Sequence, residues 1–454
     1  MQRKLDSRGK NAPFNVAVLG QGTVGSEVVS GLLSKQEYLS NQAGVPIALS
    51  AIHRRDPKKA GDLYWRSPEL FQSIDDIVKN PEISVVCELM GNIEAARHAI
   101  HGALENGKHV VSANKALFAE EWPELLRLAE ENNVQVRFEA AVAGGIPILG
   151  ALAAGSPGER IKRVRGIING TTNYILDAMA ENGQSYEAAL DGAVDKGYAE
   201  KSSIDLDVLG RDASQKLSLL IAHAFGKHIP PEQINTRGIK DVTAKDMEHA
   251  KSMGLVIKLI ARAELVNGKI VARVGPEMVV AKSPLGEVPA NFNAIEVQSD
   301  LNAVGNVYRG EGAGGKPTAA SVLSDIVNIA RNRKHGYISP FGRPVEEARN
   351  EVDQRQHTFY VRFVIHDRVG VIHRITEVLE KYGINLNGVV QLPYDEKEQD
   401  ALPFFITVEG TTEANIKRAL DEIKAMDFNA EDPYCMPFEK DDLWKRTHEN
   451  PSSK

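Results

Sequence analysis

Three glycines near the N-terminus have the spacing of a dinucleotide-binding turn. The run Gly20-Gln-Gly22-Thr-Val-Gly25 follows the apolar segment 15–19 and precedes a stretch whose apolar residues have helical spacing. Between a strand and a helix, such glycines permit a tight turn, close approach of the backbone to a pyrophosphate, and close packing of the two elements. The helix N-terminus offers free N–H groups to the phosphates. We therefore predict dinucleotide binding, against the alternative of a glycine turn that holds no ligand.

The end of the next expected strand, 47–52, bears on which cofactor binds. NAD enzymes usually place an acid here for the ribose hydroxyls, whereas arginine suits a 2′-phosphate. The residues that follow this strand are His53, Arg54, Arg55 and Asp56. The two arginines favour NADP(H), and Asp56 keeps NAD(H) possible. A solvated basic loop is the alternative without a ligand.

Two lysines are candidates for proton transfer. Lys115 follows Asn114 just beyond the expected strand 108–112, at the edge where open α/β sheets bind ligands. Lys216 lies four residues after Asp212, so both side chains project from one face of a helix. A lysine near acids in a cleft can protonate a forming alkoxide. From the pattern alone, an exposed lysine and a weak surface salt bridge are the simpler explanations.

The run from Glu139 to Pro147 combines the end of a strand with two glycines and a proline. Turned backbone carbonyls of this kind can ligate a hard monovalent cation. The spacing alone is better explained by a glycine-rich crossover between domains.

Strands and helices alternate in the first half of the chain, which is typical of βαβ units and a parallel sheet. The expected strands are 15–19, 47–52, 83–89, 108–112 and 134–142, and a helix is expected over 95–104. After Gly144 the pattern changes to helices over 186–194 and 213–225 and strands over 269–274 and 277–280. The expected fold class is α/β, with a Rossmann-type parallel sheet followed by an α+β domain.

The last part of the chain is a separate small unit. A helix over 318–331 follows a glycine cluster, and the charged segment 332–356 with its prolines is typical of a linker. The elements expected beyond it are strand 358–365, helix 370–381, strands 386–392 and 404–408, and helix 413–426. This β-α-β-β-α order is most of a ferredoxin-like sandwich.

The composition excludes several function classes. The 454 residues are 42% hydrophobic, and their number suggests about three domains. A net charge of −7 without clustered basic residues argues against nucleic acid and membrane surfaces as partners. Cys87 and Cys435 are too few for a disulfide framework or a multi-cysteine metal site, and they suggest a cytoplasmic protein. We expect no signal peptide, and no apolar run reaches the roughly 18–20 residues of a membrane span.

Five longer runs have to be considered together. They are Val111-Ser-Ala-Asn-Lys115, Glu139-Ala-Ala-Val-Ala-Gly-Gly-Ile-Pro147, Arg165-Gly-Ile-Ile-Asn-Gly-Thr-Thr-Asn-Tyr-Ile175, Gly197-Tyr-Ala-Glu200 and Gly312-Ala-Gly-Gly-Lys-Pro-Thr318. They strongly resemble homoserine dehydrogenases, and the resemblance covers about residues 14–335. The runs 367–375 and 383–385 look like those of an ACT domain, the regulatory module at the C-terminus of many such enzymes.

The resemblance implies a domain organisation. The expected parts are a flexible tail over 1–13, an NAD(P)-binding domain over 14–142, a substrate-binding and dimerisation domain over 143–310, a helix that returns to the first domain over 311–335, a linker over 336–356, a ferredoxin-like ACT domain over 357–440 and a tail over 441–454. A homodimer or homotetramer is also implied.

The implied activity is the reversible reduction of L-aspartate 4-semialdehyde to L-homoserine by NAD(P)H, in threonine, methionine and isoleucine biosynthesis. Cofactor contacts are implied for Gly20, Gly22, Thr23, Val24, Gly25, Arg54, Arg55, Lys115, Gly197, Gly310 and Gly312. Substrate contacts are implied for Glu200, Asp207 and Asp212. Lys216 matches the proton donor, and Lys115 the junction of cofactor and substrate. Sodium ligands, largely backbone oxygens, are implied for Glu139, Val142, Gly144 and Ile146.

The chain departs from the family pattern between Glu200 and Asp212, where the usual Asp-Pro pair is absent and one residue is inserted. Glu200 is therefore the least secure substrate contact, and Asp205 is an alternative to it.

Other interpretations stay open. An enzyme of the aspartate-semialdehyde dehydrogenase type would need a well-placed thiolate, and a non-catalytic amino-acid sensor would need only the ACT-like part. That part suggests feedback by an effector such as L-threonine at a domain–domain interface near Asp367, Gly370 and Asn385. The alternative is a dimerisation module that has lost its ligand.

Overall fold

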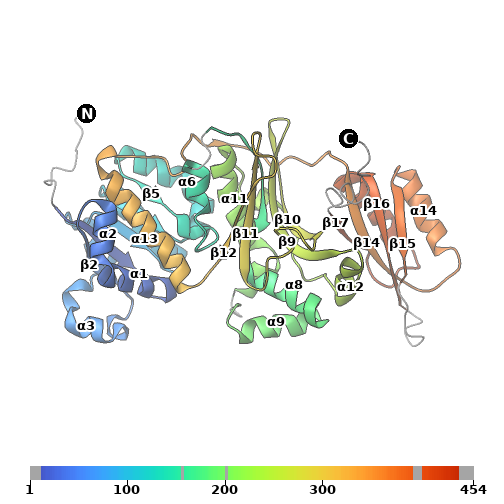
Figure 1. Ribbon diagram of the computed structural model, residues 1–454, viewed down its shortest axis with the longest axis horizontal. Coiled ribbons are helices and arrows are strands. Elements are labelled where there is room, and N and C mark those ends of the chain that lie inside the picture. Colours follow the sequence, from blue (N-terminus) through green and yellow to red (C-terminus); the bar gives the residue numbers. More distant parts are fainter. Residues whose placement is uncertain (1–11, 155–157, 200–202, 392–400, 439–454) are drawn as a thin grey trace, which may run out of the picture.

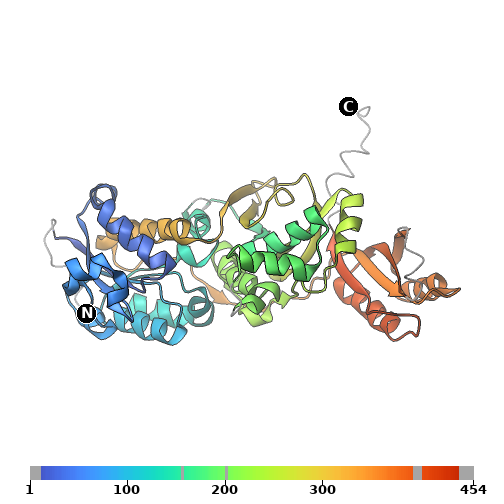
Figure 2. The same ribbon diagram turned by 90° about the horizontal axis from the view of Figure 1, so that it is seen from below.

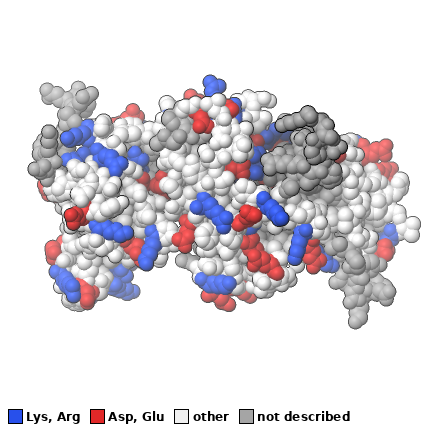
Figure 3. Space-filling model, viewed as in Figure 1, with Lys and Arg blue, Asp and Glu red and all other residues white. Residues whose placement is uncertain are grey.

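The computed structural model describes residues 12–154, 158–199, 203–391 and 401–438. Three bodies follow one another along the long axis of the molecule (Figure 1), and the view from below shows the same row (Figure 2). On the face drawn in Figure 3, basic and acidic side chains of the described residues are interspersed. Within the described residues, every helix is too short or too polar to cross a membrane.

The N-terminal body is built on a five-stranded sheet in the order β2-β1-β3-β4-β5, with all neighbours parallel. Its strands are β1 (Phe14–Leu19), β2 (Ile47–His53), β3 (Val85–Glu88), β4 (His109–Ser112) and β5 (Val136–Arg137). Its helices are α1 (Thr23–Ser34), α2 (Gln36–Ala43), α3 (Asp62–Arg66), α4 (Ile74–Lys79), α5 (Ile93–Glu105) and α6 (Lys115–Glu131). The expected α/β class is confirmed. β1 lies between β2 and β3, so the strand order reverses there, and the carboxyl ends of β1 and β3 form the crevice where such sheets bind ligands.

The predicted strand 134–142 is wrong beyond Arg137. Residues Glu139–Ala141 form a 3₁₀ turn, and Ala143 and Gly144 are left-handed, with φ of 54° and 49°. The cause is the Glu139 carboxylate, which accepts backbone N–H bonds of 2.8 and 2.7 Å from residues 149 and 150. It thereby caps the start of α7 (Ile148–Ala154), and the chain turns instead of continuing the strand.

The middle body combines helices with a long antiparallel sheet in the order β12-β11-β6-β9-β10. Its main strands are β6 (Ile161–Ile167), β9 (Leu255–Val266), β10 (Lys269–Val280), β11 (Phe292–Ser299) and β12 (Asn306–Glu311). Its helices are α8 (Gly170–Asn182), α9 (Tyr186–Asp195), α10 (Ile204–Val208), α11 (Arg211–Phe225) and α12 (Ala244–Ser252). The predicted helices 186–194 and 213–225 are confirmed as α9 and α11. β6, β9, β11 and β12 have no counterpart among the expected elements.

The two strands predicted at 269–274 and 277–280 are one continuous strand, β10. Pro276 lies inside it, paired with Leu259 of β9. On its other edge, β10 pairs with β8 (Asn235–Thr236) at residues 273–274 and with the last strand of the chain at Met278. Pro276 therefore lies in a gap between two partners, where the missing N–H breaks no ladder.

The segment after the middle sheet returns to the N-terminal body. Helix α13 (Gly315–Asn332) packs along α1, and a Cβ built on Gly31 would lie 2.6 Å from Cδ1 of Leu323. The segment 336–356, predicted as a linker, then runs along the middle body, where β13 (Glu346–Glu347) pairs with β7 (Lys227–His228).

The C-terminal body is an antiparallel sheet in the order β17-β14-β16-β15, with two helices against one face. Its elements are β14 (His357–Ile365), α14 (Val371–Lys381), β15 (Asn385–Val390), β16 (Leu402–Thr411), α15 (Glu413–Lys424) and β17 (Tyr434–Phe438). The predicted ferredoxin-like sandwich is confirmed, and β17, which the pattern did not predict, completes it. β17 also pairs with β10, Phe438 opposite Met278, so the small sheet continues the middle sheet.

The C-terminal body is fixed to the middle body by a buried polar contact. Alternate residues of β14 point to opposite faces, and Tyr360 and Arg362 point to α12. The hydroxyl of Tyr360 donates to Oδ1 of Asp246 (2.7 Å) and lies 2.8 Å from Nδ1 of His249. Arg362 forms an ion pair with the same carboxylate. Asp246 is fully buried, so its oxygens depend on these side chains for hydrogen bonds.

The Tyr360→Phe variant tests this contact. Removing the hydroxyl leaves a buried carboxylate oxygen without a donor, so we expect the free energy of unfolding to fall by about 1–3 kcal/mol. The measurement is urea denaturation followed by circular dichroism. Tyr38→Phe, at a residue that is 62% exposed, is the matched control. Equal stability of the two variants would contradict the prediction.

Candidate active site

The glycine turn after β1 has the geometry of a phosphate-binding loop. Gly20 has a φ of +94°, and a Cβ there would lie 2.6 Å from the backbone oxygen of Leu89. A Cβ on Gly25 would lie 1.8 Å from the oxygen of Gly20, so both positions require glycine. In contrast, no described atom lies within 4 Å of a Cβ built on Gly22. No described side chain caps α1, which leaves its first N–H groups, including those of Thr23 and Val24, open to a ligand.

Two arginines lie at the end of β2 as predicted, with different surroundings. Nη1 of Arg54 donates to the backbone oxygen (3.0 Å) and to Oε1 (3.2 Å) of Gln21, so this guanidinium lies directly on the glycine turn. Arg55 is exposed. In the described part of the chain, neither arginine forms an ion pair with a carboxylate.

Asp212, in the first turn of α11, brings the two predicted lysines together. Its Oδ1 lies 3.1 Å from Nζ of Lys115, and its Oδ2 lies 2.8 Å from Nζ of Lys216. Lys216 also donates to the backbone oxygen of Ile168 (2.8 Å). The side chain of Lys216 is 13% exposed and that of Asp212 is 9% exposed. This is a partly buried cluster that joins two bodies, so the simpler prediction of a surface salt bridge is wrong for Lys216.

Asn169 holds a second carboxylate beside the first. Its Nδ2 donates to Oδ1 of Asp207 (2.7 Å) and to Oδ2 of Asp212 (2.8 Å). Its Oδ1 accepts from the backbone N–H (2.9 Å) and the hydroxyl (2.8 Å) of Thr172, and so caps α8. The Asn-Gly-Thr-Thr run is therefore a helix cap whose amide group is turned toward the acids.

The pKa values of two acids in the cluster are shifted in opposite directions. Burial, followed by the nearby charge of Asp212, raises the pKa of Asp207. Burial alone would also raise the pKa of Asp212, but Lys216, Lys115 and the hydrogen bonds from Lys216 and Asn169 outweigh it and hold that pKa well below its usual range. Asp212 is therefore a carboxylate that stays ionised between the two lysine side chains.

Glu88 is a residue at this site that the sequence analysis missed. It ends β3, is fully buried, accepts from the backbone N–H of Met90 (2.6 Å) and accepts from the hydroxyl of Ser112 (2.7 Å). Ser112 in turn accepts from the backbone N–H of Asn114 (3.0 Å), next to Lys115. Glu88 thus stabilises the connection between β4 and α6, from which Lys115 projects. A buried acid at the carboxyl end of a predicted central strand is the only signal that the sequence offers.

Two further predicted segments meet beside the glycine turn. A Cβ on Gly144 would lie 2.6 Å from the oxygen of Gly312, and a Cβ on Gly310 would lie 3.2 Å from Cγ1 of Ile146. The next part of this turn reaches α1, since a Cβ on Gly315 would lie 3.0 Å from the oxygen of Thr23. The structure thus brings residues 139–147 and 310–315 together at the start of α1.

The other predicted positions near residue 200 make no described contact with the Asp212 cluster. Glu200 lies outside the described residues. Asp205, the alternative to it, forms an exposed ion pair with Lys240 (2.8 Å) and is not part of the Asp212 cluster. Gly197 is left-handed, with a φ of +72°, in the turn after α9, and nothing described lies within 4 Å of its Cβ position.

The predicted cation ligands form the turn described above. The oxygen of Gly144 accepts from the hydroxyl of Ser321 (2.7 Å), and the oxygen of Glu139 accepts a 3.3 Å bond from the N–H of Val142. The described residues hold no group of three or more His, Cys, Asp or Glu side chains suited to a metal. A cation here would therefore rest on carbonyl oxygens, each with a second lone pair.

The predicted effector residues lie in the C-terminal body, at the far end of the molecule (Figure 1). Asp367, Gly370 and Asn385 are all exposed. Gly370 is left-handed, with a φ of +88°, and precedes α14. Asn385 begins β15 and donates a long bond of 3.5 Å to Glu409.

Comparisons with known proteins agree with this geometry. Three family descriptions match the chain: "Homoserine dehydrogenase, NAD binding domain" over residues 20–139, "Homoserine dehydrogenase" over 147–327 and "ACT domain" over 359–428. The homoserine dehydrogenase of Bacillus subtilis is 34% identical over 420 residues, which are 91% of this chain and 95% of that protein. The chain belongs to the homoserine dehydrogenase family. It is an oxidoreductase with the NAD-binding and ACT domains of that family.

Solved structures of the family have the same fold. The crystal structure of a homoserine dehydrogenase from Thiobacillus denitrificans superposes with a TM-score of 0.85 at 33% identity, covering 94% of this chain and 98% of that one. A hyperthermophilic archaeal homoserine dehydrogenase in complex with NADPH has a TM-score of 0.58 at 27% identity, covering 70% of this chain and 97% of that one.

Membership of the homoserine dehydrogenase family agrees with the state of the cysteines. Burial raises the pKa of the Cys435 thiol to about 12 and raises that of Cys87, which is fully buried inside β3, still further. Neither residue offers the thiolate that chemistry of the aspartate-semialdehyde dehydrogenase type requires.

The Glu88→Gln variant tests whether the pKa of this buried carboxyl is raised. Burial raises the pKa of Glu88 from 4.5 to about 7. The protonated group therefore contributes stability that is complete below pH 4.5 and is lost as the pH rises to about 7. Glutamine cannot ionise. From pH 5 to pH 8, the free energy of unfolding of the variant should therefore rise by about 2–3 kcal/mol relative to that of the unchanged protein.

Urea denaturation at both pH values measures this difference. The exposed Glu105, changed to Gln, is the control and should show no such gain. If the difference in stability between Glu88→Gln and the unchanged protein were the same at both pH values, the carboxyl of Glu88 would not titrate between pH 5 and pH 8.

Proposed function

We propose that this chain catalyses the reversible, NAD(P)H-dependent reduction of L-aspartate 4-semialdehyde to L-homoserine. The observation that carries the proposal is the pair of ammonium groups on one buried carboxylate, Lys115 and Lys216 on Asp212. The pair lies at the junction between the dinucleotide-binding body and the middle body. The proposal places this reaction in threonine, methionine and isoleucine biosynthesis in the cytoplasm.

Lys216 is the proposed proton donor. Bound NADPH would supply a hydride to the aldehyde carbon, and the negative charge then develops on the carbonyl oxygen. The Nζ of Lys216 stabilises this charge and donates a proton to it, and Lys115 assists from the other side of Asp212. Asp212 keeps the ammonium of Lys216 oriented through its 2.8 Å contact.

The acids of the cluster are the proposed substrate contacts. Asp207 is held by Asn169 and lies beside Asp212. The substrate carries an ammonium group, and Asp207 is well suited to accept hydrogen bonds from it. A cation bound there would also favour the ionised form of Asp207, whose pKa burial raises. Glu200 remains a proposed contact by its position in the family motif.

The proposed cofactor is NADP(H), with NAD(H) as the second possibility. The pyrophosphate would lie on the Gly20–Gly25 turn and the 2′-phosphate near Arg54 and Arg55. The position of Arg54 on the glycine turn supports this, as does the NADPH complex of the archaeal relative. Gly197, Gly310 and Gly312 are proposed to approach the cofactor from the middle body.

A structural Na⁺ is proposed at the turn after β5. Backbone oxygens of Glu139, Val142, Gly144 and Ile146 would hold it. The donor set fits a hard monovalent cation, because it consists of carbonyl oxygens next to the buried carboxyl of Glu139. The ion would stiffen the turn that packs on Gly312.

Regulation and assembly complete the proposal. The ACT domain would bind an amino-acid effector such as L-threonine, with Asp367, Gly370 and Asn385 as the candidates from sequence. The domain limits given above are proposed as well. A homodimer or homotetramer is supported by exposed apolar side chains at the β11–β12 hairpin of the middle sheet, Leu301 (78%), Val304 (89%) and Val307 (42%).

The Lys216→Ala variant tests the proton donor. Loss of the ammonium removes both charge stabilisation and the proton, so we expect kcat for homoserine oxidation to fall by about 10²–10⁴-fold. The measurement is NADPH formation at 340 nm. Lys240→Ala, at an exposed lysine that also pairs with an aspartate, should keep full activity.

Near-normal turnover of Lys216→Ala would overturn the assignment. If the unchanged protein oxidised no homoserine but bound amino acids in calorimetry, the chain would be a sensor and not an enzyme.

A comparison of NADP and NAD tests the cofactor assignment. We expect kcat/KM to be higher with NADP, and Arg55→Ala should lower the value for NADP by about tenfold or more, because a charge-assisted bond to phosphate is lost. The value for NAD should change little. Lys58→Ala, on the neighbouring basic turn, is the control, and an equal loss with both cofactors would contradict the role of Arg55.

A further inference from the structure

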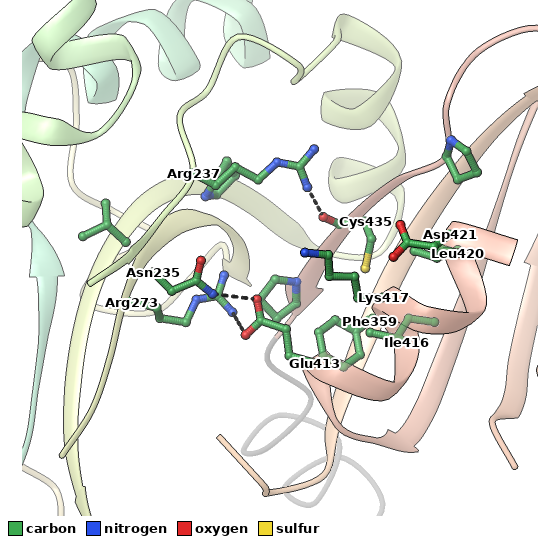
Figure 4. A pocket seen from close by; sticks show the side chains of 14 residues that line it. Asn235, Arg237, Arg273, Phe359, Glu413, Ile416, Lys417, Leu420, Asp421 and Cys435 are labelled. Carbon is green, nitrogen blue, oxygen red and sulfur yellow. Dashed lines mark hydrogen bonds and ion pairs between the residues drawn. The ribbon is translucent and has the colours of Figure 1, made fainter. Parts of the chain in front are cut away.

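A cavity of about 280 Å³ lies between the middle body and the ACT domain, and none of the residues that line it belongs to the Asp212 cluster. Figure 4 shows its two walls. Asn235, Arg237 and Arg273 come from the middle body, and Glu413, Lys417 and Asp421 come from α15 of the ACT domain. Its volume is close to the lower end of the range for small-molecule sites, about 300–1,000 Å³.

The cavity exists because of the gap in pairing along β10. β8 pairs with β10 up to Val274, and β17 begins to pair at Met278. Pro276 lies between them and is part of the cavity wall. Apolar side chains complete the wall on the ACT side, namely Phe359, Ile416 and Leu420, all buried.

Charges of both signs face this space. Glu413 bridges the two walls, because Asn235 donates to its Oε1 (3.2 Å) and Nη1 of Arg273 lies 3.9 Å from its Oε2. Nη1 of Arg237 donates to the backbone oxygen of Cys435 (2.8 Å). Lys417 extends into the space between the walls (Figure 4). Among the described residues, no carboxylate forms an ion pair with Lys417.

Within the described part of the chain, neither the side chain of Lys417 nor that of Asp421 forms a hydrogen bond or an ion pair, although both line the cavity. They lie four residues apart on one face of α15. Lys417 offers donors to a carboxylate, and Asp421 offers an acceptor to an ammonium group a short distance away. Arg237 and Arg273 add positive charge to the wall, although they already pair with Asp241 (3.2 Å) and Glu277 (3.5 Å). The apolar wall beside them suits a small aliphatic side chain. A doubly anionic ligand is disfavoured, because Glu413 and Asp421 line the same space.

We propose that this cavity binds a free α-amino acid with a small side chain, through Lys417 and Asp421. The site differs from the exposed positions Asp367, Gly370 and Asn385. The cavity would be the binding site for the amino-acid effector in the proposed function, and in this respect the proposal rests on that function.

Two residues that line the cavity lie against the turn between Asp207 and Asp212, because a Cβ built on Gly210 would lie 3.3 Å from Cγ1 of Val274 and 3.4 Å from the backbone oxygen of Arg237. A Cβ built on Gly238 would lie 2.2 Å from the backbone oxygen of Val208, and the same oxygen accepts from the N–H of Ile239 (2.9 Å). A Cβ on Gly210 would lie 3.0 Å from Cγ2 of Thr236. Val208 and Gly210 lie between Asp207 and Asp212. A ligand that moves Arg237 therefore acts on the backbone of this turn through direct contacts.

Isothermal titration of the full chain tests the proposal. The probes are L-threonine and L-valine, which carry both charges, and propionate and n-propylamine, which carry one each. We expect at least one amino acid to bind and the singly charged probes not to bind. Lys417→Met and Asp421→Asn should each weaken binding by tenfold or more. Arg418→Met is the matched control, because Arg418 lies over the ring of Tyr382 (5.2 Å) and outside the cavity.

Three results would overturn the proposal: no binding of either amino acid, equal binding of propionate, or loss of binding in Asn385→Ala with unchanged binding in Lys417→Met and Asp421→Asn. Initial rates of homoserine oxidation, each relative to the same variant without amino acid, should lose their response in Lys417→Met. Titration does not depend on turnover, so a chain without dehydrogenase activity would contradict the proposed function and leave the binding result intact.

Discussion

The contact between Asp212 and two lysines is the constraint on which the rest of the site depends. A buried carboxylate is costly unless it is paired and hydrogen-bonded. Lys115 comes from the N-terminal body, whereas Lys216 and the Asn169 amide come from the middle body. Asp212 therefore has all of its partners only when the two bodies are placed correctly. The same contact that orients the proposed proton donor also fixes the position of the dinucleotide-binding body.

The position of the ACT domain likewise depends on the middle body, because strands of the two bodies form one sheet. A single sheet runs from β12 through β10 and β17 to β15. The ACT domain is therefore joined to the middle body by a strand pair and by the Tyr360–Asp246 contact, in addition to the covalent connection. A change at this junction reaches β10 and the residues packed on it without a hinge. The cavity beside Pro276 lies between the two partners of β10 on this edge, β8 and β17.

Much of the fold could be predicted from the sequence, and the failures have physical causes. The N-terminal strands are continuous apolar runs, and the helices α9, α11, α14 and α15 have apolar residues at helical spacing, so both were predictable. β9 was not, because Lys258, Arg262 and Glu264 lie inside the sheet as buried or nearly buried ion pairs and disturb the alternation of apolar and polar residues. The end of β5 was missed because the capping role of Glu139 depends on α7.

The site was predictable to the same degree. The spacing of Asp212 and Lys216 and the position of Lys115 after β4 gave the lysines. The contributions of Asn169 and Glu88 depend on contacts across 43 and 24 residues of sequence, which no local pattern records. The family motif contains Asn169, but only the structure explains it as a cap that also holds two acids.

The acids around the crevice show how position divides their tasks. Glu88, Asp207 and Asp212 are all largely buried, yet the pKa is raised in the first two and lowered in the third. Burial acts in the same direction on all of them, so the difference comes from the two ammonium groups that only Asp212 contacts. Groups whose environments separate their pKa values in this way can take different parts in acid–base chemistry. Asp212 stays ionised and holds the two lysines, which leaves Asp207 available for the proposed contact with the ammonium group of the substrate.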